Sequence, residues 1–148
     1  MMEIRKLERC HLDMIKARFK SVFMNEPWND DWSDEEQLHN YILDLAGNSN
    51  SLSLGLYDGE DLVGVSLGHI MHWCTGTEYY IQEFFIVTEH QRKGLGTLFL
   101  REIEAYAKAR RIHQIFLQTE RNVPAYVFYT KAGFKELEGH VSLVKRLE

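Results

Sequence analysis

The stretch QRKGLGTL, residues 91–98, follows an apolar run rich in β-forming residues and opens a helical pattern. Glycines let a backbone approach a ligand closely, and the first N–H groups of a helix have no partner within it. This combination favours an anion. Arg92 and Lys93 add positive charge at a helix end where cations are otherwise unfavourable. The stretch therefore predicts a site for a phosphate-bearing cofactor.

Two common phosphate-binding loops do not match this stretch. A P-loop closes with Gly-Lys-Ser/Thr, whereas residues 94–97 read Gly-Leu-Gly-Thr. A dinucleotide-binding fingerprint needs a third Gly or Ala where Phe99 stands, together with a first strand near the N-terminus. Neither class accounts for the loop.

The remaining sequence predicts a mixed α/β protein with a single domain over residues 1–148. Hydrophobic periodicity, turn signals and a capping box from Ser33 to Glu36 delimit its elements. Strands are expected at residues 3–7, 51–57, 62–73, 77–87 and 115–118, with two more closing the chain. Helices are expected at residues 11–27, 33–47 and 94–110, and a short one begins at Pro124.

Composition excludes several classes of function. A net charge of −5 and a pI near 5.8 argue against non-specific nucleic-acid binding, which needs an excess of Lys and Arg. The N-terminus is charged and no apolar run approaches the ~20 residues of a membrane span, so a cytoplasmic protein with no membrane partner is expected. Cys10 and Cys74 match no metal or redox spacing, and strand alternation separates His69 from His72, so no metal is expected.

Two segments resemble the GCN5-related N-acetyltransferase (GNAT) superfamily: EFFIVTEHQRKGLGTLFL, residues 83–100, and NVPAYVFYTKAGF, residues 122–134. The resemblance covers nearly the whole chain. It implies a single-domain α/β fold with a central, mixed but mostly antiparallel sheet of about seven strands and four helices, splayed between strands 4 and 5. It also implies acetyl-CoA as co-substrate.

The resemblance assigns residues to the cofactor. The pantetheine arm would pair with the backbone of the fourth strand and contact the loop before the last helix. The loop after that strand would hold the pyrophosphate. The residues implied are Phe84, Phe85, Ile86, Gln91, Arg92, Lys93, Gly94, Leu95, Gly96, Thr97 and Asn122.

Acetyl transfer to an amine makes two demands on protons. An amine with a pKa of about 10.4 must lose a proton, which costs roughly 4–5 kcal/mol at pH 7, and the leaving sulfur must gain one. Glu83, in the middle of the fourth strand, is the candidate base, and the resemblance implies that Tyr129 faces the sulfur as the candidate acid. The alternatives are that Glu83 faces solvent or an ion pair, and that Tyr129 is a core aromatic.

The segment MNEPWNDDW, residues 24–32, combines acids and tryptophans within a span from Lys20 to Arg92 that contains no other Lys or Arg. In the GNAT superfamily, the connection between the first two helices usually forms a wall of the acceptor site. Carboxylates and indoles there suit a cationic amine. The candidate residues are Glu26, Trp28, Asp30, Asp31 and Trp32, although one tryptophan could instead fill the core.

The resulting hypothesis is an acetyl-CoA-dependent N-acetyltransferase that transfers acetyl directly to a primary amine of a small, cationic acceptor such as an aminoglycoside or a polyamine. The segment around Trp28 resembles bacterial small-amine and aminoglycoside-type members. A protein N-terminal or lysine acetyltransferase, and a non-catalytic acyl-CoA sensor, stay open as alternatives. A homodimer is also open.

Overall fold

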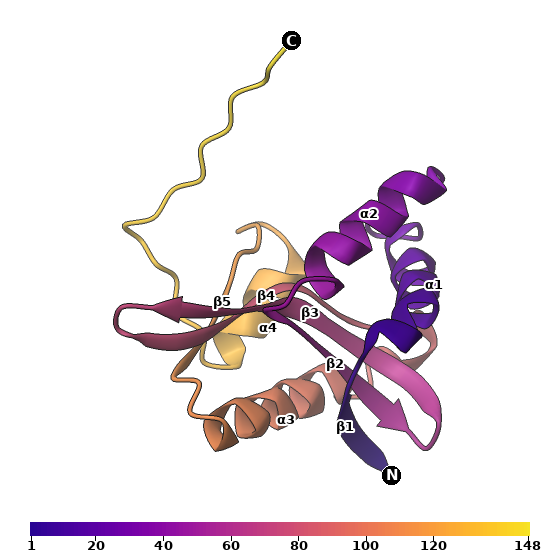
Figure 1. The fold of residues 1–148 in the computed structure, drawn as a ribbon, viewed down its shortest axis with the longest axis horizontal. Coiled ribbons are helices and arrows are strands. Elements are labelled where there is room, and N and C mark those ends of the chain that lie inside the picture. Colours follow the sequence, from indigo (N-terminus) through magenta and orange to yellow (C-terminus); the bar gives the residue numbers. More distant parts are fainter. The chain divides into compact units, whose positions relative to one another are not determined.

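A five-stranded sheet organises the first part of the chain (Figure 1). The computed structural model describes residues 1–148, which divide into two units, 1–118 and 119–148. The sheet has the order β1-β2-β3-β4-β5, and all neighbours are antiparallel except β4 and β5. Its strands are β1 (Met2–Lys6), β2 (Ser51–Asp58), β3 (Asp61–Trp73), β4 (Gly76–Ile86) and β5 (Gln114–Leu117).

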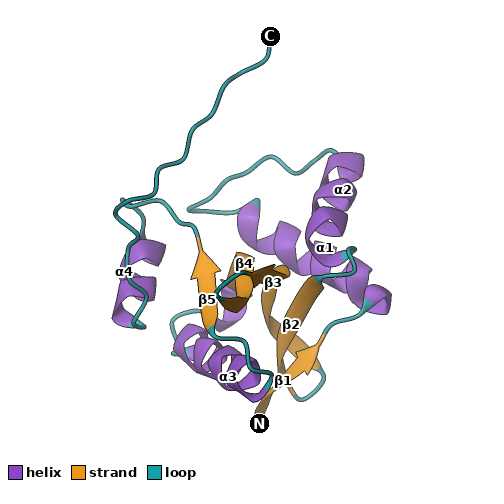
Figure 2. Ribbon diagram, turned by 60° about the vertical axis from the view of Figure 1, so that its left-hand side comes forward, coloured by secondary structure: helices purple, strands orange, loops and turns teal.

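Helices cover both faces of this sheet (Figure 2). The helices α1 (Leu12–Phe23) and α2 (Glu35–Ala46) pack on one face, and α3 (Leu95–Ala109) packs on the other. Two short 3-10 turns, η1 (Arg9–His11) and η2 (Thr88–His90), precede α1 and α3. The hydrophobic periodicity that predicts a helix at residues 33–47 places an apolar stripe on it, and Leu38, Ile42 and Leu45 of that stripe are buried in α2. None of the helices combines the length and the apolar character needed to cross a bilayer.

A β-bulge in β4 changes which face of the sheet its side chains occupy. Glu83 pairs with Leu67 of β3, but the next pair toward the N-terminus of β4 joins Ile81 to Gly68, so Gln82 is an extra residue. Before the bulge Ile81 packs in the core cluster on the α3 side, whereas after it Phe85 packs in the cluster under α1 and α2. Because side chains alternate along a strand, the extra residue moves Glu83 onto the α1/α2 face.

The second unit contains one helix, α4 (Pro124–Lys131). An ion pair joins Arg121, which precedes this helix, to Glu136, which follows it. The Tyr126 hydroxyl within the helix donates a hydrogen bond of 2.9 Å to the same Glu136. Residues 135–148 form neither helix nor strand and are exposed. The expectation of about seven strands is therefore wrong, since the sheet has five: β-forming residues such as Val141 make a strand only where a neighbouring strand accepts their backbone hydrogen bonds.

The start of α2 also differs from the expected capping box. Asp34, not Ser33, is the N-cap residue, and its carboxylate accepts hydrogen bonds of 3.1 Å from the amides of Glu36 and Gln37. Ser33 instead donates its hydroxyl to Asp31 at 2.6 Å. Since the Ser33 side chain is already engaged, the following carboxylate caps the helix.

Candidate functional site

Glu83 is the acid that the fold turns toward α1 and α2. The Tyr41 hydroxyl of α2 donates a hydrogen bond of 2.5 Å to Glu83 Oε2. The two residues are 42 positions apart, and the β4 bulge is what brings the carboxylate to the helix. Tyr41 lies at helical spacing from Leu38 and Leu45 and so belongs to the apolar stripe of α2. A tyrosine within such a stripe usually needs a partner for its hydroxyl, and this is the signal that could have indicated its role.

The aromatic residues around Tyr41 form a closed stack. The Trp32 ring lies parallel to the Tyr41 ring, with centroids 5.3 Å apart and an interplanar angle of 19°. Phe19 of α1 contacts both of them, at 5.8 Å from Tyr41 and 5.3 Å from Trp32. The Trp32 indole Nε1 is buried without a hydrogen-bond partner. Trp32 is thus the tryptophan that fills the core.

Burial and charge act together on Glu83. Burial raises the pKa of this carboxyl, the hydrogen bond from Tyr41 lowers it, and the negative charge of Asp30 raises it. Burial, followed by the charge of Glu83, raises the pKa of the Tyr41 hydroxyl, which therefore stays protonated as the donor. A carboxylate with a raised pKa is a better proton acceptor near neutral pH than an ordinary surface acid.

The connection between α1 and α2 brings only part of its acidity to Glu83. Asp30 is held by its own backbone N–H, which donates to the Phe23 carbonyl at 2.8 Å, and its charge acts on both Glu83 and Tyr41. Asp31 accepts two hydrogen bonds from Ser33, one from the backbone and one from the hydroxyl, and this lowers its pKa.

The other two candidates on this connection are exposed. Trp28 is 42% exposed and packs one side against Phe23, with ring centroids 5.5 Å apart. Glu26 is exposed on the same connection. Of the five residues expected to form an acceptor wall, Trp32 stacks on Tyr41, and the charge of Asp30 acts on both Glu83 and Tyr41.

The end of β4 beyond the bulge has a strand neighbour on one side only. The parallel ladder with β5 stops where Ile81 pairs with Leu117, while β3 accompanies β4 to its end at Ile86. Phe84 stacks on Phe99 of α3, and Phe85 packs in the core under α1 and α2. The expected separation of the fourth and fifth strands therefore occurs at the bulge.

The glycine loop leads from this edge into α3. The Gln91 side-chain amide donates to the Ile86 carbonyl at 2.8 Å, which ties the loop to the end of β4. Arg92 and Gly94 both have positive φ values, 63° and 77°, so the chain turns sharply before the helix. A Cβ on Gly94 would meet no atom within 4 Å, so the surface in front of it is open.

The first turn of α3 leaves its amides available. No side chain caps the helix, and its first turn contains no acid. The N–H groups of Leu95, Gly96 and Thr97 consequently have no partner within the helix, and they lie at the positive end of its dipole. With Arg92 and Lys93 beside it, this terminus has the chemistry of a pyrophosphate site, and the residues present fit that group.

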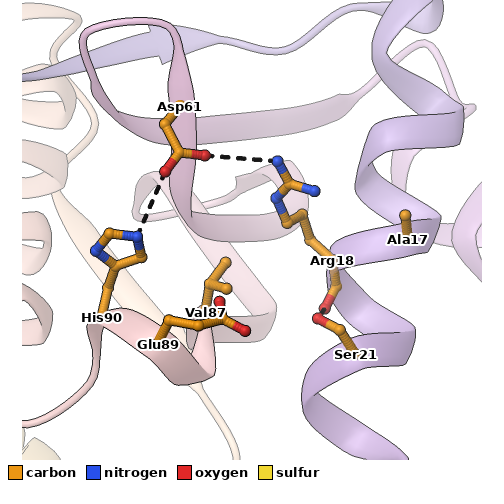
Figure 3. Close-up of a pocket in the computed structure, with 7 residues that line it drawn as sticks. All are labelled: Ala17, Arg18, Ser21, Asp61, Val87, Glu89 and His90. Carbon is orange, nitrogen blue, oxygen red and sulfur yellow. Dashed lines mark hydrogen bonds and ion pairs between the residues drawn. The ribbon is translucent and has the colours of Figure 1, made fainter.

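A small hollow lies behind the loop, on the side of α1 (Figure 3). Asp61 at the start of β3 lies between two basic side chains there: its carboxylate is 3.6 Å from Arg18 Nη2 and 3.4 Å from His90 Nε2. Arg18 also donates to the Leu62 carbonyl at 3.1 Å. These contacts connect α1 and β3 to His90, the residue before Gln91, and so they hold the start of the loop in place. Glu83 is not among the residues that line the hollow.

Asn122 and Tyr129 belong to the second unit. Asn122 is exposed in the turn before α4, and Tyr129 lies on α4 with its ring 5.5 Å from Phe134. The Phe134 amide also donates to the Tyr129 carbonyl at 3.0 Å. Glu83 belongs to the first unit and Tyr129 to the second, so their joint action stays a prediction. No three His, Cys, Asp or Glu side chains are grouped so that they could hold a metal ion.

This combination of a bulged fourth strand, an open strand edge and a glycine loop at a helix N-terminus agrees with the comparison with known families. Residues 12–134 match the acetyltransferase (GNAT) family, and the chain belongs to that family. The family expected from residues 83–100 and 122–134 is thereby confirmed.

Individual relatives are distant. The uncharacterized N-acetyltransferase YobR of Bacillus subtilis is 28% identical over 92 residues, which are 62% of this chain and 36% of YobR. This chain therefore matches about a third of the length of that relative.

Two solved structures share the fold. An aminoglycoside acetyltransferase from an uncultured soil metagenomic sample, in complex with sisomicin, has a TM-score of 0.74 and 19% identity, covering 99% of this chain and 97% of that one. A predicted acetyltransferase of Clostridium acetobutylicum with acetyl-CoA has a TM-score of 0.73 and 19% identity, covering 97% and 96%.

Proposed function

We propose that this protein transfers an acetyl group from acetyl-CoA directly to a primary amine of a small, cationic acceptor. The observation that carries the proposal is the position of Glu83, which the β4 bulge directs to a site bordered by Asp30. A carboxylate there has two roles toward an amine: its charge attracts the ammonium form, and its oxygen can then accept the proton.

The donor side of the proposal rests on the open edge of β4 and the loop beyond it. Acetyl-CoA would lay its pantetheine arm along residues 84–86, where β5 has ended, with Asn122 contacting the same arm. Its pyrophosphate would meet the amides of residues 92–97 and the side chains of Arg92 and Lys93, while Gln91 holds the loop in place. The solved C. acetobutylicum protein of the same fold contains acetyl-CoA, which supports this choice of cofactor.

The reaction needs one base and one acid. Glu83 takes a proton from the ammonium group, directly or through a water molecule, and the neutral amine attacks the thioester carbonyl. The C–N bond forms, the C–S bond then breaks, and Tyr129 donates its hydroxyl proton to the leaving sulfur. The nitrogen, which is cationic after the attack, gives up its second proton to form the neutral amide, and this proton restores the Tyr129 hydroxyl directly or through water. Because a thiol has a pKa near 8.5 and a tyrosine near 10, full transfer is uphill by about 2 kcal/mol, so the proton moves as charge builds on sulfur.

The acceptor side is acidic and aromatic. Asp30 and Glu26 are exposed carboxylates, and Trp28 presents an exposed indole face next to them. No Lys or Arg occurs between Lys20 and Arg92 to neutralise the segment locally. A cationic amine such as an aminoglycoside or a polyamine suits this wall, and the sisomicin complex of a protein with the same fold is consistent with that choice.

The direct test is release of free thiol from acetyl-CoA in the presence of single amines: an aminoglycoside, a polyamine, an amino acid and a peptide with a free N-terminus. We expect turnover with the polycationic acceptors and loss of at least about 100-fold in Glu83→Gln. Binding of acetyl-CoA without thiol release for any amine would instead assign the protein to the non-catalytic sensors.

A further inference from the structure

We propose that Tyr41 is the positioning residue of the site: its hydroxyl fixes Glu83 Oε2 and thereby leaves Oε1 as the oxygen that receives the proton from the amine. The inference rests on the proposed function, in which Glu83 is the base. It assigns a role to a residue of α2 that neither the glycine loop nor the C-terminal motif includes.

The geometry supports a fixed orientation of the carboxylate. The Tyr41 hydroxyl to Glu83 Oε2 distance of 2.5 Å is at the short end for an O–H donor and a carboxylate. Tyr41 is the one hydrogen-bond donor that acts on the Glu83 carboxyl, and it binds Oε2. One oxygen is therefore held by α2, and the other remains open to a substrate proton.

The aromatic stack keeps the hydroxyl in place. Tyr41 lies between Trp32, at 5.3 Å and nearly parallel, and Phe19, at 5.8 Å. Phe19 is itself buried in the core beneath α1. Rotation of the Tyr41 ring would break both contacts, so the ring is held in one orientation. The fixed Tyr41 hydroxyl therefore determines the position of the Glu83 carboxylate.

The hydroxyl also balances the charges that face Glu83. Burial raises the pKa of Glu83, and the negative charge of Asp30 on the α1–α2 connection also raises it. From α2 the Tyr41 hydroxyl lowers it, while the β3 neighbour of Glu83 is the apolar Leu67. The Tyr41 hydroxyl thus opposes burial and the charge of Asp30, both of which favour the neutral form of Glu83.

The test is the pH profile of kcat/KM for the acceptor amine in Tyr41→Phe. This change keeps the ring and its stacking but removes the hydroxyl. Because a hydrogen bond to the ionised form lowers a carboxyl pKa, its loss should move the acid limb of the profile to higher pH. We expect kcat/KM near neutral pH to fall about 10-fold, with the KM for acetyl-CoA unchanged.

Tyr79→Phe is the matched control. Tyr79 lies on the same strand but faces α3, and its buried hydroxyl bonds Ser66 Oγ and the Leu52 carbonyl. It should lower the melting temperature without moving the acid limb. A merely structural role for Tyr41 would give this same result, and an acid limb in Tyr41→Phe that coincides with that of the wild type would overturn the proposal.

The inference can fail separately from the proposed function. If the wild-type protein turns over amines and depends on Glu83, an unmoved acid limb in Tyr41→Phe refutes the role of Tyr41 alone. If no amine is acetylated, the proposed function fails. The Tyr41 effect is then read from a ¹³C NMR titration of the Glu83 carboxyl in the wild type and in Tyr41→Phe, where an unchanged midpoint would again refute it.

Discussion

Gly68 of β3 lies so close to Tyr80 of β4 that a Cβ on Gly68 would collide with the Tyr80 carbonyl oxygen. The contact is next to the bulge at Gln82, where Gly68 pairs with Ile81. Since the clashing atom belongs to the backbone, no side-chain rotation could relieve it. The close approach of β3 and β4 at this glycine therefore maintains the bulge that directs Glu83.

Replacement of Gly68 by alanine tests this relationship. Gly68→Ala should separate the strands at the bulge and lower stability by about 1–3 kcal/mol, as expected for overpacking, and it should reduce acetyl transfer more than acetyl-CoA binding. Thermal unfolding and thiol release measure the two effects. Gly139→Ala is the control, because a Cβ there meets no atom within 4 Å. Full activity in Gly68→Ala would contradict the role of the bulge.

The raised pKa of Glu83 predicts that this side chain lowers the stability of the folded protein although activity depends on it. Burial raises the pKa of Glu83 in the folded state above its ordinary value of 4.5, so the native state loses stability as pH rises through that raised pKa. Glu83→Gln should therefore raise the melting temperature, by about 2–4 °C near pH 7.5, while abolishing turnover. The gain should shrink as pH falls toward 4.5.

Glu78→Gln on the same strand is the control for that experiment. Its carboxylate accepts a hydrogen bond of 2.6 Å from Gln114 of β5. Glu78 lies in the part of β4 that pairs with β5, before the bulge that precedes Glu83. It should not reproduce the gain in melting temperature. A pH-independent difference between Glu83→Gln and the wild type would argue against burial of a charged Glu83.

The hydrogen bond from Gln91 to the Ile86 carbonyl predicts a specific loss of cofactor affinity. Gln91→Ala should release the loop from β4 and weaken acetyl-CoA binding about 10-fold, with a smaller effect on kcat at saturating acetyl-CoA. Isothermal titration calorimetry measures the affinity. Gln114→Ala also removes a side-chain amide hydrogen bond, from β5 to Glu78, and should leave the affinity unchanged.

Tyr129 and Tyr126 offer a matched pair on α4. Tyr129→Phe should reduce turnover about 100-fold, as expected when a general acid is lost, and leave acetyl-CoA affinity largely intact. In Tyr126→Phe the missing hydroxyl is the one that donates to Glu136, so only stability should change. Equal turnover in the two variants would remove Tyr129 from the mechanism.

The acidic connection between α1 and α2 should contribute unequally to acceptor binding. Asp30→Asn should raise the KM for a polycationic amine about fivefold, because its charge acts on the Glu83 site. Asp31→Asn should have a smaller effect, since that carboxylate is occupied by Ser33. Asp13→Asn on the exposed face of α1 is the control. An unaltered KM in Asp30→Asn would exclude the connection as the acceptor wall.

Several elements could be predicted from local sequence because their causes are local. The hairpin of β2 and β3, the stripe of α2 and the glycine loop before α3 each follow from turn residues, periodicity or backbone freedom over a few positions. The two strands expected after residue 134 are the contrasting case. Their β propensity is a local property, but a strand requires a hydrogen-bonding partner, and residues 135–148 have none in the sheet.

The family, the glycine loop and the two candidate catalytic residues can be predicted without a structure, because motifs and helix termini depend on residues that are neighbours along the chain. The direction in which Glu83 points and the residue that it contacts depend on the packed fold. A single extra residue at Gln82 reverses the alternation of β4, and the pairing with Tyr41 joins positions 42 residues apart. Neither follows from strand periodicity, since a bulge and a long-range hydrogen bond exist only once β3, β4 and α2 have packed together.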